Sequence, residues 1–261
     1  MWLVMGLVVL SIANSAQDLK ERVINLAPEI SSDPTSAAIA RSSAIDSTGN
    51  IVDVQNSIID RLAHYGTEYG GFVVVPDLLP FGGNALCAGV GEDISFDQSL
   101  IDKHSMKVIA IDPTEKAKNY VQKLSLHNFW FLERALVGEN AAENITIFAN
   151  KHTHYVSESV LSSHTGIDER AARTVQTIKL SQLQQVFDRF DLIKLDIEGA
   201  EYDLIDQLPA LGARTICIEF HHHCTDYTEA DTQRAVNTLA AAGYFVISTE
   251  GKHEYTFFKL Q

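Results

Sequence analysis

The chain has 261 residues, of which 46% are apolar and 21% are charged, so it holds enough apolar material for one sizeable hydrophobic core. Its 20 lysines and arginines against 34 aspartates and glutamates give a formal net charge of −14. Because no basic run could neutralise phosphates, the composition disfavours nucleic acids and anionic membranes as partners. The three cysteines, Cys87, Cys217 and Cys224, show no C-x-x-C spacing and cannot form a disulfide framework.

The N-terminal segment, residues 1–16, contains an almost unbroken apolar run from Trp2 to Leu10. The run is short for a membrane span, but it has the length of the apolar part of a signal peptide, and small residues that could form a cleavage site follow it. No lysine or arginine precedes it, which favours an apolar helix docked on the domain instead. Both alternatives stay open. The chain is therefore expected in the cytoplasm or in the secretory pathway, with membrane contact only if the segment is an uncleaved anchor.

Residues 17–69 are expected to form an N-terminal extension. Residues 31–50 carry six serines with Pro34 and Gly49, a composition typical of a linker. Apolar residues from Val52 to His64 keep helical spacing and predict a helix. The remainder, residues 70–261, is predicted to be one catalytic domain.

Beyond residue 70, short apolar strands alternate with helical stretches, which indicates parallel βαβ units. The last two strands are separated only by a loop around Gly251, too short for a parallel crossover, so they predict an antiparallel hairpin. Helices are expected near residues 95–104, 114–125, 181–189, 201–208 and 229–242. Strands are expected near residues 85–89, 107–112, 132–137, 145–149, 191–197, 214–220, 244–249 and 255–260.

The first motif is a strand that runs into Gly89-x-Gly91 and then into a helix. Glycines at this position permit a tight turn and let the backbone approach a nucleoside closely. The third glycine of a dinucleotide-binding motif is absent, since Ile94 stands there. Glu92 and Asp93 would repel a diphosphate at this helix start but suit a ligand with a cationic sulfonium and an amino group. The motif therefore favours S-adenosylmethionine over NAD.

The second motif is Asp112, which ends the next predicted strand 23 residues after Gly89. A carboxylate at this place can accept both ribose hydroxyls, because its two oxygens match a vicinal diol. The alternative is an aspartate that caps the following helix. The spacing favours ribose binding.

The third motif places Lys194 and Asp196 on one face of an apolar strand, with Asp196 at the carboxyl end, where α/β sheets place their sites. An ionisable pair in so apolar a run is costly unless it is paired or used. Asp196 is therefore our first candidate for the catalytic base or for the residue that orients the acceptor. The alternative makes it a structural partner of Lys194.

The fourth motif is the run of three histidines that begins at His221. Adjacent histidines suggest a metal, but ligands of one ion usually need helical or turn spacing, and no second pair of ligands is evident nearby. We therefore expect no metal and a structural or acceptor-binding role, with His221 as the second candidate base. The segment at residues 151–164, between the expected strands, is too long for a plain connection, so we expect it to form either a lid over the acceptor or a solvated loop.

Taken together, three blocks resemble one enzyme family. Residues 194–201, Lys-Leu-Asp-Ile-Glu-Gly-Ala-Glu, resemble the K-x-D-x-E-G-x-E signature of FkbM methyltransferases. Residues 89–97 and 111–114 resemble the G-x-G-E-D-x-S-F-D and F-D-P-T blocks of one FkbM-like branch. The similarity covers about residues 70–260.

This resemblance implies a Rossmann-like methyltransferase fold: an α/β domain with a mostly parallel seven-stranded sheet and a C-terminal antiparallel hairpin. It also implies S-adenosylmethionine as the cofactor and O-methylation of a hydroxyl on a small-molecule or glycan acceptor, such as a sugar or natural product. Contacts to the cofactor are expected from Gly89, Gly91, Glu92 and Asp112.

Two alternatives belong to other functional classes. A nicotinamide-dependent Rossmann oxidoreductase is disfavoured by the two acids in the glycine turn and by the closing hairpin. A non-catalytic relative that binds cofactor or glycan without turnover is left open by the sequence.

Overall fold

A computed structural model describes residues 11–13, 58, 61–152, 157–251 and 253–260 of the chain. The apolar run at residues 2–10 and the linker at residues 31–50 lie outside this part. So does most of the helix expected between residues 52 and 64, but the last residues of that stretch belong to a strand, β2 (Ala63–Tyr65).

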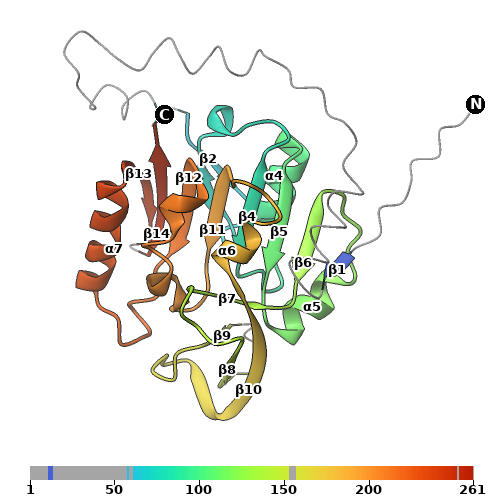
Figure 1. The fold of residues 1–261 in the computed structure, drawn as a ribbon, viewed down its shortest axis with the longest axis vertical. Helices are drawn as coiled ribbons and strands as arrows, with labels where there is room; N and C mark the ends of the chain where they lie inside the picture. Colours follow the sequence, from blue (N-terminus) through green and yellow to red (C-terminus); the bar gives the residue numbers. More distant parts are fainter. Residues whose placement is uncertain (1–10, 14–57, 59–60, 153–156, 252, 261) are drawn as a thin grey trace, which may run out of the picture.

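The main sheet follows the order β1-β6-β5-β4-β11-β12-β14-β13, and only β14 runs against the others (Figure 1). Seven of these strands form the expected Rossmann-like sheet, closed by the expected antiparallel hairpin, and β1 adds an eighth strand at one edge. Counted in chain order from β4, the seven strands lie in the order 3-2-1-4-5-7-6. Their bounds are β1 (Ser11–Ala13), β4 (Asn84–Ala88), β5 (Lys107–Ile111), β6 (Phe129–Leu132), β11 (Leu192–Leu195), β12 (Thr215–Glu219), β13 (Tyr244–Glu250) and β14 (Glu254–Lys259).

Helices cover both faces of this sheet, and the side chains of β4 show how. Leu86 and Ala88 belong to one buried cluster, which the helices α6 and α7 cover, whereas Ala85 and Cys87 belong to a second cluster under α4 and α5. This alternation is the period-two pattern of a strand buried on both sides. The helices are α4 (Ser95–His104), α5 (Glu115–Val121), α6 (Leu180–Leu183) and α7 (Glu229–Ala241).

The short hairpin of β2 and β3 (Phe72–Val74) packs into the second cluster, where Tyr65 is buried although it precedes residue 70. A short 3₁₀ helix, η1 (Pro76–Leu78), follows it. No helix in the part of the chain that the structure describes is long and apolar enough to cross a bilayer.

Two expected helices differ from the structure. The stretch near residues 201–208 forms two separate 3₁₀ segments, η2 (Ala200–Asp203) and η3 (Leu208–Leu211), with Pro209 in the first turn of the second. The helix expected near residues 181–189 is the shorter α6.

A second sheet of four strands has the order β7-β10-β8-β9 and lies below the carboxyl ends of the parallel strands in Figure 1. The strand expected near residues 132–137 is split between the sheets, into β6 and β7. The strand expected near residues 145–149 is β8 of this small sheet and not part of the main one. The strands of this second sheet are β7 (Ala135–Val137), β8 (Asn144–Asn150), β9 (Glu158–Ser159) and β10 (Ile167–Lys179).

Candidate active site

The glycine turn after β4 lies against the end of β11. Gly89 and Gly91 both have positive φ, +85° and +53°. A Cβ atom on Gly89 would lie only 1.7 Å from the backbone oxygen of Asp196. Only glycine therefore fits there, and this close approach brings two of the predicted motifs to one place. The turn lines a cavity at the carboxyl edge of the sheet, together with Tyr69, Asp93, Asp112, Glu158, Lys194, Asp196 and Glu198 among others.

Asp112 is buried under this turn and holds its backbone. Its Oδ2 atom accepts hydrogen bonds from the Val90 and Gly91 amides at 2.9 Å each, and its Oδ1 atom accepts one from the Thr114 amide at 2.7 Å. A carboxylate has about four lone pairs, so roughly one remains for a ligand hydroxyl. The cap of α5 is Thr114, whose side chain accepts from the Ala117 amide, so Asp112 is not the helix cap.

The two acids of the turn face different surroundings. Glu92 is exposed and does not line the cavity, although it is one of the residues predicted to contact the cofactor. Asp93 does line it, and its carboxylate accepts hydrogen bonds from the Thr67 hydroxyl and, at 2.8 Å, from the Ser95 amide. Burial tends to raise the pKa of Asp93, but these hydrogen bonds outweigh it and lower the pKa below its ordinary value. The cavity wall therefore keeps a negative charge.

Lys194 is 4% exposed and joins the two strand ends. Its Nζ atom donates to the backbone oxygen of Gly89 at 2.6 Å and lies 3.3 Å from Oδ2 of Asp196. The predicted pair of Lys194 and Asp196 therefore exists. It leaves Oδ1 of Asp196 available, and that side chain is 25% exposed.

His221 is oriented by Glu201, whose side chain is fully buried. One carboxylate oxygen of Glu201 accepts from the His221 amide at 3.0 Å and lies 2.6 Å from Nδ1 of the same residue, and the other accepts from the Gly199 amide. Since a carboxylate only accepts, Nδ1 carries a proton and Nε2 faces the cavity. Nε2 lies 3.7 Å from Asp196 Oδ1 and 3.6 Å from Glu198 Oε2, beyond hydrogen-bonding distance.

The charge state of His221 follows from these neighbours. Burial lowers its pKa, but Glu201 first, and then Glu198 and Asp196, raise it more strongly, to about 10. The imidazole is thus protonated near neutral pH when no metal is bound. A protonated imidazole donates hydrogen bonds and cannot remove a proton, so the arrangement does not suit His221 as a base.

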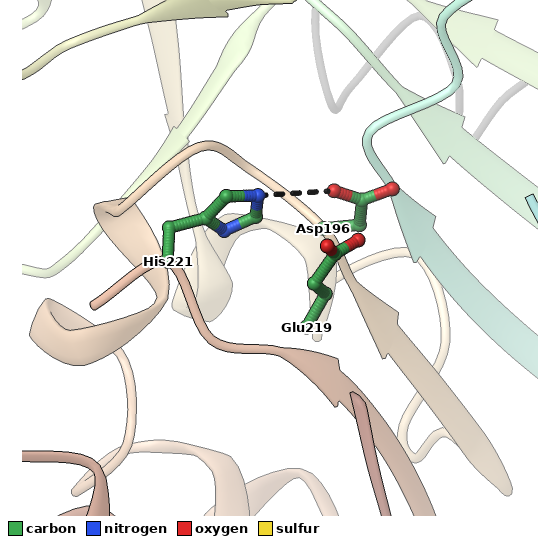
Figure 2. A group of neighbouring side chains, drawn as sticks. All are labelled: Asp196, Glu219 and His221. Carbon is green, nitrogen blue, oxygen red and sulfur yellow. Dashed lines mark ion pairs between the residues drawn. The ribbon is translucent and has the colours of Figure 1, made fainter. Parts of the chain in front are cut away.

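Glu219, the last residue of β12, joins this group and was not among the predicted site residues. Figure 2 shows the side chains of Asp196, Glu219 and His221 pointing toward one another from the ends of β11 and β12. Burial, and next the charge of Asp196, raise the pKa of Glu219 to about 7. The signal that could have found it is its place at the carboxyl end of an apolar strand, two residues before His221.

A second cavity of about 480 Å³ opens beside the first. It is lined by Glu219, His221 and Glu254, and by His164 from the segment predicted to be a lid or loop. From the same segment, Ser157, Glu158 and Val160 line the first cavity, while residues 153–156 lie outside the described part. The two cavities share Tyr69, Asp196 and Glu198.

The remaining two histidines of the run point in different directions. Nδ1 of His222 lies 2.9 Å from the Thr232 hydroxyl on α7, away from the cavity lining. His223 lines the second cavity and packs its ring against that of His253, 4.1 Å away between ring centroids.

Comparison with known proteins gives one family match. The model of the FkbM methyltransferase domain matches residues 83–246. No curated protein matches the chain.

The solved structures that resemble the chain are remote. A fibrillarin/Nop5p complex aligns with 12% identity and a TM-score of 0.42 over 69% of this chain and 73% of that one. A methyltransferase from Pyrococcus furiosus aligns with 15% identity and a TM-score of 0.37, over 69% and 77%. A TehB-like SAM-dependent methyltransferase from Corynebacterium glutamicum aligns with 11% identity and a TM-score of 0.34, over 94% and 98%.

Proposed function

The chain belongs to the FkbM methyltransferase family, and we propose that it methylates a hydroxyl of a sugar or small natural product with S-adenosylmethionine as the methyl donor. The observation that carries this proposal is the junction of the two cavities. Asp196 and Glu198 line both, so a donor in one cavity and an acceptor in the other would meet at these carboxylates.

The first cavity has the features that S-adenosylmethionine needs. The missing Cβ of Gly89 leaves room where the backbone turns, and Asp112 fixes the Val90 and Gly91 amides. Asp93 provides the negative charge that suits a cationic sulfonium. Asp112 retains about one lone pair for one ribose hydroxyl, rather than for both. Glu92 has no part in this assignment.

When bound, S-adenosylmethionine supplies an electrophilic methyl group. The residues of this chain must hold an acceptor oxygen in line with it and take the hydroxyl proton. Oδ1 of Asp196 is placed for that transfer, because Lys194 holds the other oxygen and the group lies at the junction. A positioned base of this kind contributes roughly 10²–10⁴ in rate. As long as no metal is bound, the protonated Nε2 of His221 is suited to donate a hydrogen bond to the acceptor.

The lining of the second cavity supports a neutral, hydroxyl-rich acceptor. Glu198, Glu219 and Glu254 all face it, and carboxylates accept hydrogen bonds from hydroxyls. The same charges would repel a phosphate or a sulfate. A polyhydroxylated sugar or natural product suits this cavity better than an anionic metabolite or a nucleic acid.

Nicotinamide chemistry finds no support in these features. The family match and the antiparallel closing hairpin both separate the chain from that class. Calorimetry should therefore show binding of S-adenosylmethionine or S-adenosylhomocysteine and no binding of NAD or NADP.

The test of the proposal is a methyl-transfer assay with radiolabelled S-adenosylmethionine. A panel of neutral glycans and hydroxylated natural products is compared with phosphorylated sugars, and labelled products are identified by mass spectrometry. We expect label on a hydroxyl oxygen of a neutral acceptor. Cofactor binding without label on any acceptor would favour the non-catalytic alternative, and label on nitrogen, carbon or a phosphorylated sugar would contradict the proposed acceptor class.

A further inference from the structure

Three potential metal ligands meet at the floor of the second cavity. Asp196, Glu219 and His221 each offer one ligand atom, and these atoms all lie within 4.8 Å of one another (Figure 2). The grouping is set by the register of the main sheet. Leu195 of β11 pairs with Ile218 of β12, so Asp196, which follows β11, and Glu219, the last residue of β12, lie at the same level.

The distances suit a single ion after a small adjustment. Ligands bound at about 2.1 Å in an octahedral shell stand roughly 3 Å apart when adjacent and about 4.2 Å apart when opposite. The separation between His221 Nε2 and Asp196 Oδ1 is 3.7 Å, and that between Nε2 and Glu198 Oε2 is 3.6 Å. Side-chain movements of about 1 Å or less would close the shell around one ion. Oε2 of Glu198 already lies 3.0 Å from Nε2 of His164, so Glu198 would become a fourth ligand by exchanging that contact for the ion or by turning its other oxygen toward it.

The orientation of His221 is the second observation that points to a metal. A metal-binding histidine usually donates its other ring N–H to a carboxylate, which fixes the ring and leaves the free nitrogen for the ion. Glu201 does this here: it is fully buried, lies 2.6 Å from Nδ1 and is itself held by the Gly199 amide. His221 is only 4% exposed, and its Nε2 atom consequently faces the carboxylates of Asp196 and Glu198 without making a hydrogen bond.

The charges also favour a cation. Three carboxylates, those of Asp196, Glu198 and Glu219, lie around this point, and the ammonium of Lys194, 3.3 Å from Asp196 Oδ2, offsets one of them. A divalent ion would offset this charge. Carboxylates suit Mg²⁺ and Mn²⁺, and an imidazole suits first-row transition ions. Mn²⁺ satisfies both preferences.

We propose that Asp196, Glu219 and His221, with Glu198 as a fourth ligand, form a binding site for one divalent transition-metal ion of the Mn²⁺ type. The site departs from the expectation of no metal, which rested on the lack of a second ligand pair in the sequence near His221. The ion takes the Nε2 lone pair, so its binding releases the proton there. Binding does not depend on the proposed function. Its role does: with the ion bound, Nε2 of His221 would bind the metal instead of donating to the acceptor. The ion would bind the acceptor oxygen and acidify its hydroxyl, and Asp196 would be a ligand of that ion as well as the group that takes the proton.

The experiment titrates metal-free full-length protein with MnCl₂ and follows the loss of the electron paramagnetic resonance signal of free Mn²⁺. We expect one Mn²⁺ per chain. Glu219→Gln keeps the size of the side chain and should weaken binding at least about tenfold, as should His221→Ala. His223→Ala is the matched control, because His223 lies on the same cavity wall and its ring is not in the proposed ligand set. It should change the affinity less than about twofold.

Two results would overturn the site. One is the absence of saturable Mn²⁺ binding. The other is an equal loss in His223→Ala and His221→Ala, which would mean that the histidine run binds metal non-specifically. If His221→Ala fails to fold, Glu219→Gln alone decides, with a circular dichroism spectrum to show that it is folded. A separate calorimetric titration with S-adenosylmethionine, in EDTA to keep the protein metal-free, distinguishes the two proposals. If the cofactor binds there but the Mn²⁺ titration shows no saturable binding, the metal site is rejected and the methyltransferase proposal stands.

Discussion

Gly89 and Asp196 touch through their backbones: a Cβ atom added to Gly89 would lie 1.7 Å from the Asp196 backbone oxygen. Lys194 reinforces the contact by bonding both the Gly89 oxygen and the Asp196 carboxylate. The wall of the cofactor cavity and the residue assigned to proton removal are therefore parts of one rigid unit. A change at Gly89 should affect Asp196 directly.

Gly89→Ala tests this contact. The substitution forces Asp196 to move and places alanine at a φ of +85°, so we expect S-adenosylmethionine affinity to fall at least about tenfold and stability to fall by about 1–3 kcal/mol or more. Gly82→Ala is the matched control, because its φ is +71° but a Cβ there meets nothing within 4 Å. It should lose only about 1 kcal/mol and keep its cofactor affinity. Equal effects of the two variants in urea unfolding and calorimetry would reject the contact as the cause.

Asp112→Ala removes the acceptor of three backbone hydrogen bonds. Each buried N–H left without a partner costs about 1–3 kcal/mol, so the glycine turn should loosen and melting temperature should fall. Cofactor affinity should drop at least about tenfold in calorimetry. Unchanged affinity in a destabilised variant would mean that Asp112 supports the fold without shaping the cofactor cavity.

The adjacent acids Glu92 and Asp93 form a matched pair. Asp93→Asn neutralises a carboxylate that lines the cavity and should weaken S-adenosylmethionine binding, by about 1 kcal/mol or more. Glu92→Gln changes an exposed side chain outside the lining and should leave the affinity unchanged. Calorimetry at low and high salt measures both. A larger loss for Glu92→Gln would support the prediction from the sequence that Glu92 contacts the cofactor.

Asp97 on α4 gives a pH-dependent prediction. It is 3% exposed, and burial raises its pKa from the ordinary 3.8 to about 6, although Lys194 opposes the rise. Because the folded pKa is the higher one, its stabilising contribution is present in acid and is lost as the pH rises through about 6. A rise of this size corresponds to about 3 kcal/mol.

Asp97→Asn cannot titrate and should escape that loss. Relative to the unmodified protein, its free energy of unfolding should therefore increase by up to about 3 kcal/mol between pH 4 and pH 8. Urea unfolding at four or five pH values provides the measurement. If the difference between the two proteins stayed constant with pH, Asp97 would not titrate in this range.

The alternation of strands and helices could be predicted from the sequence because each element carries its own periodicity. The glycine turn, the hairpin around Gly251 and the position of Asp196 follow from local patterns of this kind. The long strand β10 does not: most of its side chains are at least partly exposed, so it lacks an apolar pattern to mark it.

The parts of the site that the sequence missed depend on contacts between distant elements. Glu219 reaches Asp196 only through the pairing of β11 with β12. Glu201 orients His221 from 20 residues away. Whether Glu92 or Asp93 faces the cavity depends on the rotation of the turn, which composition does not reveal.

The role of Asp196 in taking the acceptor proton is tested most directly by the turnover of Asp196→Asn with the acceptor found by the labelling assay. The cofactor affinity and the melting temperature of the variant are measured beside it. The variant keeps the shape of the side chain and loses the charge. We predict that turnover falls by roughly 10²-fold or more while S-adenosylmethionine affinity changes little. If Asp196 only pairs with Lys194, the variant should instead lose roughly 3–5 kcal/mol of stability. A large fall in melting temperature with normal specific activity in the folded fraction would contradict the catalytic role of Asp196.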